Sequence, residues 1–234
     1  MNLLPSATAN EVREANHQVA VLPVGSLEQH GDHLPITTDT LVANLIAQEI
    51  SATYGLFLLP PVTFGCSHEH AALGATVSIR ATTLYDVVND IADSLRRSGV
   101  MKLVVVNGHG GNYVLSNVVQ EANERERRMA LFPSRSDWDA ARSAAGMQTT
   151  GHDDMHAGEL ETSLLLFSQP EMVRSSFTGA DHDASNRPLF PTQGMQRYAP
   201  SGVIGRPSLA SAEKGKLALG TLVERFRLHL RAMA

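Results

Sequence analysis

The order of apolar and polar positions predicts that strands and helices alternate along the chain. Apolar, β-branched runs predict buried strands at residues 19–24, 56–62, 103–106 and 129–132, with a shorter strand at 76–79. The third of these runs is apolar on both faces, which is typical of a strand in the middle of a parallel sheet.

Apolar residues at helical spacing fill the intervals between these runs. The spacing predicts helices around residues 41–50, 84–95, 114–122, 136–146 and 219–230. Strands that alternate with helices point to a parallel sheet covered by helices on both faces. The pattern therefore predicts the α/β class, as a three-layer α/β/α fold with a mainly parallel sheet.

One domain accounts for the whole length. The chain has 234 residues, 43% of them hydrophobic, which is enough for one large α/β domain spanning residues 1–234. Residues 177–207 are rich in Pro, Gly, Asp and Ser and show no clear periodicity. Because long irregular segments are uncommon inside compact domains, we expect this one to be a functional lid or an oligomer contact.

Composition excludes several classes of partner. The net charge of -5 comes without a basic stripe, so we expect neither nucleic acid nor an anionic membrane as partner. No apolar run approaches the roughly 20 residues of a membrane span, and residues 1–17 lack the pattern of a signal peptide. A single cysteine, Cys66, rules out an intrachain disulfide and fits a reducing cytoplasm.

Potential metal ligands follow two of the predicted strands. Glu28, His30 and Asp39 come after the first strand, and His109 lies between glycines after the third. Since ligands bind at the carboxyl ends of strands in open α/β sheets, these side chains can meet in space. Two carboxylates with imidazoles suit Zn²⁺, Mn²⁺ or Fe²⁺ better than Ca²⁺. The alternative is a solvated loop in which Asp39 is only a helix N-cap.

A third polar cluster occupies residues 152–163. If a helix begins near His156, Glu159 lies one turn further on the same face. Glu161 is then rotated away, unless the first turn is irregular. An acidic first turn that complements the helix dipole is the alternative, but it does not explain His156 as well.

Together the three clusters resemble the creatininase family of metal-dependent amidohydrolases. Three segments carry the resemblance, namely Gly25-Ser26-Leu27-Glu28-Gln29-His30-Gly31-Asp32-His33-Leu34-Pro35, Asn107-Gly108-His109-Gly110-Gly111-Asn112 and His156-Ala157-Gly158-Glu159-Leu160-Glu161-Thr162-Ser163. Residues 65–70, 201–205 and 212–215 support it, so that it covers nearly the whole chain.

The resemblance implies a cytoplasmic enzyme, often a homohexamer, with two divalent metal ions per chain. Such an enzyme hydrolyses a C–N amide bond in a cyclic or linear small-molecule substrate. By motif match, Glu28, Asp39 and His109 would hold one ion, and His30 with a bridging Asp39 would hold the other. A metal-activated bridging water would attack the amide carbon.

One departure from the creatininase pattern affects the second ion. Creatininase carries a Glu where this chain has Gly111, so a replacement carboxylate is needed. We expect Glu159 to supply it, with Glu161 as the second candidate. His156 is the expected acid/base that carries a proton to the leaving amine, and Glu161 is the other candidate catalytic group.

The remaining polar residues of the motifs are candidates for contact with substrate. We assign substrate binding to His33, Ser67, His70 and Asn112. A two-metal phosphoesterase would need Arg or Lys in the motifs, and none is present. A non-catalytic metal-containing binding protein is the rival from another class. Formamide deformylases and mycofactocin-type precursor peptidases share the Gly-Gly form of the His109 loop.

Overall fold

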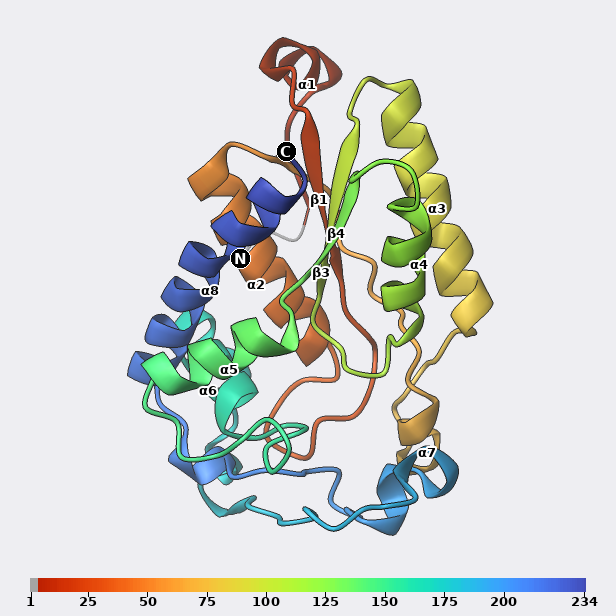
Figure 1. Cartoon of the computed structure of the whole chain (residues 1–234). Coiled ribbons are helices and arrows are strands. Elements are labelled where there is room, and N and C mark those ends of the chain that lie inside the picture. The colour runs from red at the N-terminus through yellow and green to blue at the C-terminus, as the bar shows by residue number, and fades with distance from the viewer. Residues whose placement is uncertain (1–3) are drawn as a thin grey trace.

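The computed structural model describes residues 4–234, and within that range four parallel strands form one sheet in the order β2-β1-β3-β4 (Figure 1). The strands are β1 (Val19–Val24), β2 (Phe57–Leu58), β3 (Lys102–Asn107) and β4 (Met129–Phe132). Val24 pairs with Asn107, so β1 and β3 end at the same level. The predicted parallel sheet is thereby confirmed.

Helices and short 3₁₀ turns make up the rest of the regular structure. The α-helices are α1 (Ala9–Ala15), α2 (Thr38–Tyr54), α3 (Ala81–Arg97), α4 (Val114–Ala122), α5 (Arg135–Ala144), α6 (Glu159–Ser168), α7 (Phe190–Gln193) and α8 (Ala212–Ala232). The 3₁₀ turns are η1 (His68–Leu73), η2 (Pro170–Met172), η3 (Ser175–Gly179), η4 (Met195–Arg197) and η5 (Pro207–Leu209). Within the described residues, no helix has the length and apolar character needed to cross a membrane.

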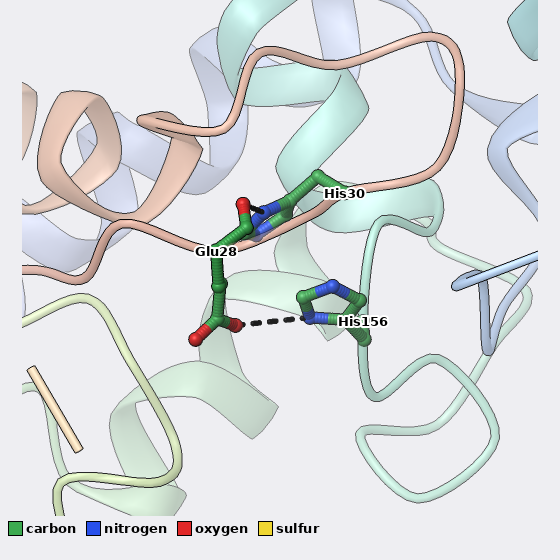
Figure 2. A group of neighbouring side chains, drawn as sticks. All are labelled: Glu28, His30 and His156. Atoms are coloured by element: carbon green, nitrogen blue, oxygen red, sulfur yellow. Dashed lines mark hydrogen bonds and ion pairs between the residues drawn. The ribbon is translucent and has the colours of Figure 1, made fainter. Parts of the chain in front are cut away.

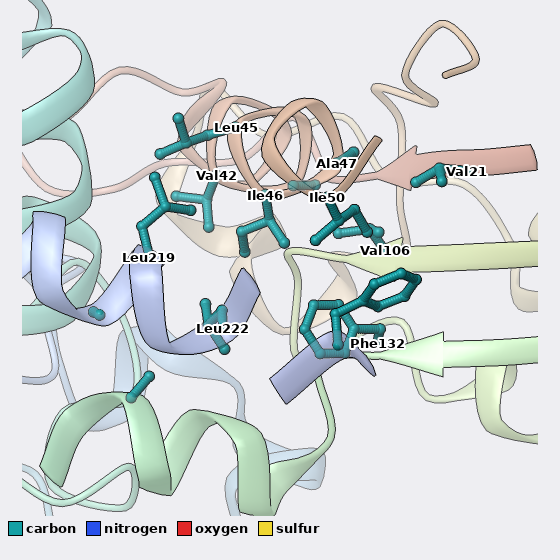
Figure 3. Close-up of a cluster of buried hydrophobic side chains, with 14 of the residues drawn as sticks. Val21, Val42, Leu45, Ile46, Ala47, Ile50, Val106, Phe132, Leu219 and Leu222 are labelled. Carbon is teal, nitrogen blue, oxygen red and sulfur yellow. The ribbon is translucent and has the colours of Figure 1, made fainter. Parts of the chain in front are cut away.

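The helices cover both faces of the sheet, as predicted. Helices α2, α5, α6 and α8 lie on one face, and α3 and α4 lie on the other (Figure 1). Because alternate strand residues point to opposite faces, Val104 and Phe132 pack against α2 and α8 in the first helix layer. Val105 packs against α3 and α4 in the second helix layer. Figure 3 shows the first of these cores, where Ile46 and Leu222 meet between α2, α8 and the sheet.

Two predicted strands are shorter in the structure. The run at 56–62 pairs as a strand only over β2, and Val62 adds an isolated bridge to Val24. Pro60 and Pro61 explain the interruption, because proline has no N–H to donate to a neighbouring strand. The predicted strand at 76–79 is wrong, since Val77 makes only a single antiparallel bridge.

The irregular segment at 177–207 lies across the end of the molecule to which the strands point (Figure 1). It contains α7 and η4, overlaps η3 and η5 at its two ends, and is joined to the loop before α6 by a backbone pair between Ile204 and His156. Ile204 exchanges two hydrogen bonds of 3.0 Å with His156. A role in oligomer contact stays a prediction.

A buried carboxylate joins α5 to α8 on the outside of the first layer. Asp137 closes a capping box with Ser134 and accepts hydrogen bonds of 2.7 Å from Arg225 Nε and His229 Nε2. Burial alone would raise the pKa of Asp137, but its bonds to Ser134, Arg225 and His229 outweigh burial and lower it. The ionised form of Asp137 therefore stabilises the fold.

We expect Asp137→Asn to lower the free energy of unfolding by about 1–3 kcal/mol at pH 7, because a buried bond to charged partners is lost. A group whose pKa is depressed by folding contributes stability above its unfolded pKa, about 4, and that stability is lost as the pH falls through the folded pKa. In urea titrations, the difference in the free energy of unfolding between wild type and Asp137→Asn should therefore become smaller below about pH 4. The control is Asp139→Asn on the same helix, where the carboxylate is exposed. If wild type and Asp137→Asn differ in the free energy of unfolding by the same amount at pH 3 and pH 7, the ionised Asp137 carboxylate does not stabilise the fold.

Candidate metal centre

The candidate site forms where α2 begins beside the ends of β1 and β3. Gly25 and Gly108 follow these two strands, and both lie against the first turn of α2. A Cβ atom on Gly25 would stand 2.4 Å from the backbone of Thr40, and one on Gly108 would stand 2.3 Å from the Asp39 carbonyl oxygen. Only glycine permits this approach, which brings the Asp39 side chain between the two strand-end loops.

The first ligand group consists of Glu28, Asp39 and His109. His109 Nδ1 lies 3.0 Å from Asp39 Oδ2, and His109 Nε2 lies 3.2 Å from Glu28 Oε2. Burial alone would lower the pKa of His109, but Asp39 and Glu28 outweigh it and raise the pKa to about 10. The imidazole thus carries a proton between two carboxylates, in the place where a metal cation would neutralise them.

The second group shares Asp39 with the first. His30 Nε2 lies 3.1 Å from Asp39 Oδ1, and Glu161 completes the group from the first turn of α6. His30 Nδ1 lies 3.1 Å from the Glu28 carbonyl oxygen, to which it donates, so the other ring nitrogen faces the centre. Each Asp39 oxygen thus faces a different histidine, and both candidate ligand groups include this carboxylate.

His156 approaches the same centre from the loop before α6. Figure 2 shows its ring beside His30, with the Glu28 carboxylate directed toward it. Its Nε2 lies 2.7 Å from the Gln29 carbonyl oxygen and must donate there, so Nδ1 is left unprotonated, 3.6 Å from Glu28 Oε1. Burial, with His30 and His70 nearby, lowers the pKa of His156 well below its usual range. The ring is therefore neutral, and its Nδ1 is free to accept a hydrogen bond or to join Glu28 and His30 as a third candidate ligand group.

Glu28 supplies the observation that favours a metal most directly. Its side chain is fully buried, and nitrogens of His70, His109 and His156 lie 3.2–3.6 Å from its carboxylate oxygens without completing a hydrogen bond. Burial, and then the neighbouring Asp39, raise its pKa to about 8. A buried carboxylate without hydrogen bonds is costly. A divalent cation within reach of its oxygens would remove that cost, so the residues fit such an ion.

The donor set also fits two divalent ions of the predicted kind. Three carboxylates and the imidazoles offer oxygen and nitrogen atoms, without a thiolate. This combination suits Zn, Mn or Fe. Burial, and then Asp39, raise the pKa of Glu161 to about 7, although His30 lowers it. Positive charge at the centre would hold Glu161 ionised.

The structure does not bring Glu159 to the centre. Its buried carboxylate pairs with Lys214 Nζ and accepts a 2.7 Å hydrogen bond from the Thr149 hydroxyl. A ligand role for Glu159 requires a helix that begins near His156, but α6 begins at Glu159 itself, and His156 pairs with Ile204 in an antiparallel bridge. The Glu161 carboxylate, which accepts a bond of 2.6 Å from Ala157 N, faces the centre instead.

Asp154 fixes the start of α6, a role that the sequence pattern does not predict. Its carboxylate accepts bonds from the backbone N–H groups of Glu159 and Leu160, at 2.5 and 3.1 Å. Arg142 Nη1 donates to the same side chain at 2.8 Å. A Ser, Thr, Asp or Asn five residues before a predicted helix is a weak signal, since caps normally lie directly at the helix start.

The four residues assigned to substrate binding are all buried, and each has at least one polar atom in contact with a protein group, although the buried His33 Nδ1 has no hydrogen-bond partner among the described residues. His33 Nε2 lies 3.0 Å from the Ala157 carbonyl oxygen, which positions the loop before α6. Asn112 Oδ1 accepts a 2.8 Å bond from Cys66 N, and its amide donates to Gly25 O at 3.2 Å. These bonds hold both side chains to backbone groups beside the centre, and their contact with substrate stays a prediction.

The other two lie closer to the metal ligands. His70 Nδ1 accepts a 2.9 Å bond from the Gln29 side-chain amide, so its protonated Nε2 faces Glu28 Oε1 at 3.3 Å. The Ser67 hydroxyl lies 3.4 Å from His109 Nε2. Both side chains contact ligands of the candidate centre, and their contact with substrate stays a prediction.

Comparison with known proteins agrees with the geometry. A family model described as "Creatininase: Creatinine amidohydrolase" matches residues 5–229. The chain belongs to the creatininase family. The resemblance inferred from the three motifs is therefore confirmed.

Two relatives and one solved structure illustrate this membership. The mycofactocin precursor peptide peptidase of Mycobacterium ulcerans (strain Agy99) is 32% identical over 216 residues, covering 87% of this chain and 81% of that protein. The creatinine amidohydrolase of Pseudomonas putida is 31% identical over 225 residues, covering 88% and 86%. A structure titled "Creatininase Mn" has a TM-score of 0.82 at 25% identity and covers 97% of this chain and 96% of that one.

We expect Glu161→Gln to lower the metal content of the purified protein by one ion, because a neutral amide is a poor replacement for a carboxylate ligand. Glu159→Gln is the matched control on the same helix. It should keep the metal content and lower the free energy of unfolding by about 1–3 kcal/mol, since Lys214 loses its partner. Plasma mass spectrometry of the purified proteins gives the stoichiometry. If only Glu159→Gln loses an ion, then Glu159 and not Glu161 is the metal ligand.

Proposed function

We propose that this creatininase family member is a metal-dependent amidohydrolase that cleaves a C–N amide bond in a small-molecule substrate. Two divalent ions, Zn, Mn or Fe, would be held by Glu28, His30, Asp39, His109 and Glu161. When bound, such ions activate water as a nucleophile and polarise the substrate carbonyl. The observation that supports this proposal most strongly is the fully buried Glu28 carboxylate, which faces histidine nitrogens and makes no hydrogen bond within residues 4–234, beside the Asp39 carboxylate, which faces two histidines.

His156 would move the proton that amide hydrolysis requires. An amine leaves readily only after it gains a proton, and the attacking water must lose one. The unprotonated Nδ1 of His156 faces the centre, while its Nε2–H is held by the Gln29 carbonyl oxygen. This arrangement fixes the ring and leaves one nitrogen to accept a proton and pass it on.

The charges around the centre favour amide over phosphate chemistry. The ion pairs of Glu28 and Asp39 are all with histidines. The nearby cations are engaged elsewhere: Lys214 pairs with Glu159, and Arg142 pairs with Asp154. A phosphoesterase would direct such cations at its substrate.

The relatives support hydrolysis of a C–N bond. Two relatives are a creatinine amidohydrolase and a mycofactocin precursor peptide peptidase. Gly111, in place of the Glu of creatininase, sets this chain apart from the first. A mycofactocin-type peptidase activity is therefore the second candidate, and it would use the same residues.

We expect amide hydrolysis by the purified protein to stop after treatment with a chelator. Zn or Mn added back in slight excess should restore it, while Mg should not, because imidazole ligands suit the former ions. A panel of formamides, cyclic amides and short peptides with an amine-release assay provides the measurement. Activity that survives complete removal of metal, verified by plasma mass spectrometry, would overturn the proposal.

We expect His156→Gln to lower kcat by a factor of about 10² to 10⁴, which is the usual contribution of a general acid/base. The metal content should not change. His152→Gln is the control, because His152 is exposed and bonds to Ser185 O on the outer side of the same loop. A variant that loses an ion together with its activity would make His156 a metal ligand rather than a proton carrier.

A further inference from the structure

A cavity of about 450 Å³ adjoins the metal centre, and neither the ligands nor the proposed mechanism accounts for it. It lies between η1, the loop around Gly111 and the segment 190–196, which includes α7. Figure 1 shows α7 beside the η1 turn at the end of the molecule to which the strands point. Its volume is in the range of pockets that bind small ligands.

Gly111 joins this cavity to the centre. A Cβ atom at this position would stand 2.5 Å from His109 Nε2, 2.5 Å from Cys66 O and 2.3 Å from Glu69 Oε1. No side chain fits there unless these groups move. The volume that a larger residue would take is occupied in this chain by the Glu69 carboxylate.

Glu69 is positioned for a ligand outside the metal centre. Its Oε1 lies 3.9 Å from His109 Nε2, and among the described residues no other group pairs with its carboxylate. It belongs to none of the groups of converging metal ligands. Its side chain is 17% exposed, so a molecule in the cavity can reach it.

The rest of the cavity wall is largely uncharged. Ala71, Val114 and Phe190 contribute apolar side chains, and His68 lies at the rim. Within residues 4–234, no lysine, arginine or aspartate lines the cavity, so Glu69 is the one acidic group that does. The carboxylate would repel an anionic group in the cavity, whereas a cation would find in it a charged partner.

We propose that Glu69 determines specificity by binding a protonated amine of the substrate, while the apolar wall receives an uncharged arm. This inference rests on the proposed amidohydrolase function and names its substrate class. That class is the amides that carry a free amino group near the scissile bond, such as amino-acid amides and short peptides. Amides with a phosphate or carboxylate at the same place are excluded.

Three chromogenic amides with the same leaving group test the proposal on the metal-loaded protein. Alanine p-nitroanilide is cationic, propionyl p-nitroanilide is neutral, and succinyl p-nitroanilide is anionic. We expect kcat/KM to fall in that order, with at least about a tenfold difference between the first two, the size of one good charge-assisted contact. In Glu69→Gln the ratio of cationic to neutral substrate should fall towards one, and in Glu69→Lys the anionic substrate should become the better one.

Glu126→Gln serves as the control, because this exposed acid lies outside the cavity, in the connection before β4, and its removal should leave the ratio unchanged. Equal kcat/KM values for the three amides in wild type, or an unchanged ratio in Glu69→Gln, would overturn the inference. A Glu69→Gln protein with reduced metal content would also overturn it, because Glu69 would then act through the ions.

A binding measurement separates this inference from the proposed function. Calorimetry on the metal-loaded protein compares alaninamide with propionamide. Tighter binding of the cationic amide that disappears in Glu69→Gln supports the role of Glu69 even if no amide is cleaved. If the protein cleaves amides but shows no preference for cationic over neutral amides in binding or rate, the proposed function is supported and the role of Glu69 is wrong.

Discussion

The candidate centre depends on the close approach of α2 to the ends of β1 and β3. Gly25 and Gly108 permit that approach, because any side chain at either position would collide with the first turn of the helix. The helix then presents Asp39 with one oxygen toward His30 and the other toward His109. Both ligand groups share this carboxylate, so a shift of the helix would disturb both at once.

Local sequence patterns predicted the sheet and the part of the site at its edge. Strands that are apolar on both faces are unambiguous, and ligands after such strands must gather at their carboxyl ends. Glu28, His30, Asp39 and His109 were therefore brought together from the sequence alone, and the structure places their donor atoms within reach of one another. The strand at 56–62 was overestimated, because two prolines outweigh the apolar character of that run.

The choice between Glu159 and Glu161 could not be made from spacing. It depends on the residue at which α6 starts, and that residue is set by Asp154, whose carboxylate binds the first N–H groups of the helix from a separate loop. The pairing of His156 with Ile204 is equally remote in sequence. Helical periodicity applies only inside a helix, so tertiary contacts decided which of the two acids faces the centre.

The backbone pair between His156 and Ile204 has a consequence for turnover. The residue that would carry the proton and the segment that covers the site share two hydrogen bonds, and the next pair, between His182 and Gly205, extends the same connection. A rearrangement of this segment that separates these pairs would therefore also move the backbone that holds the His156 ring.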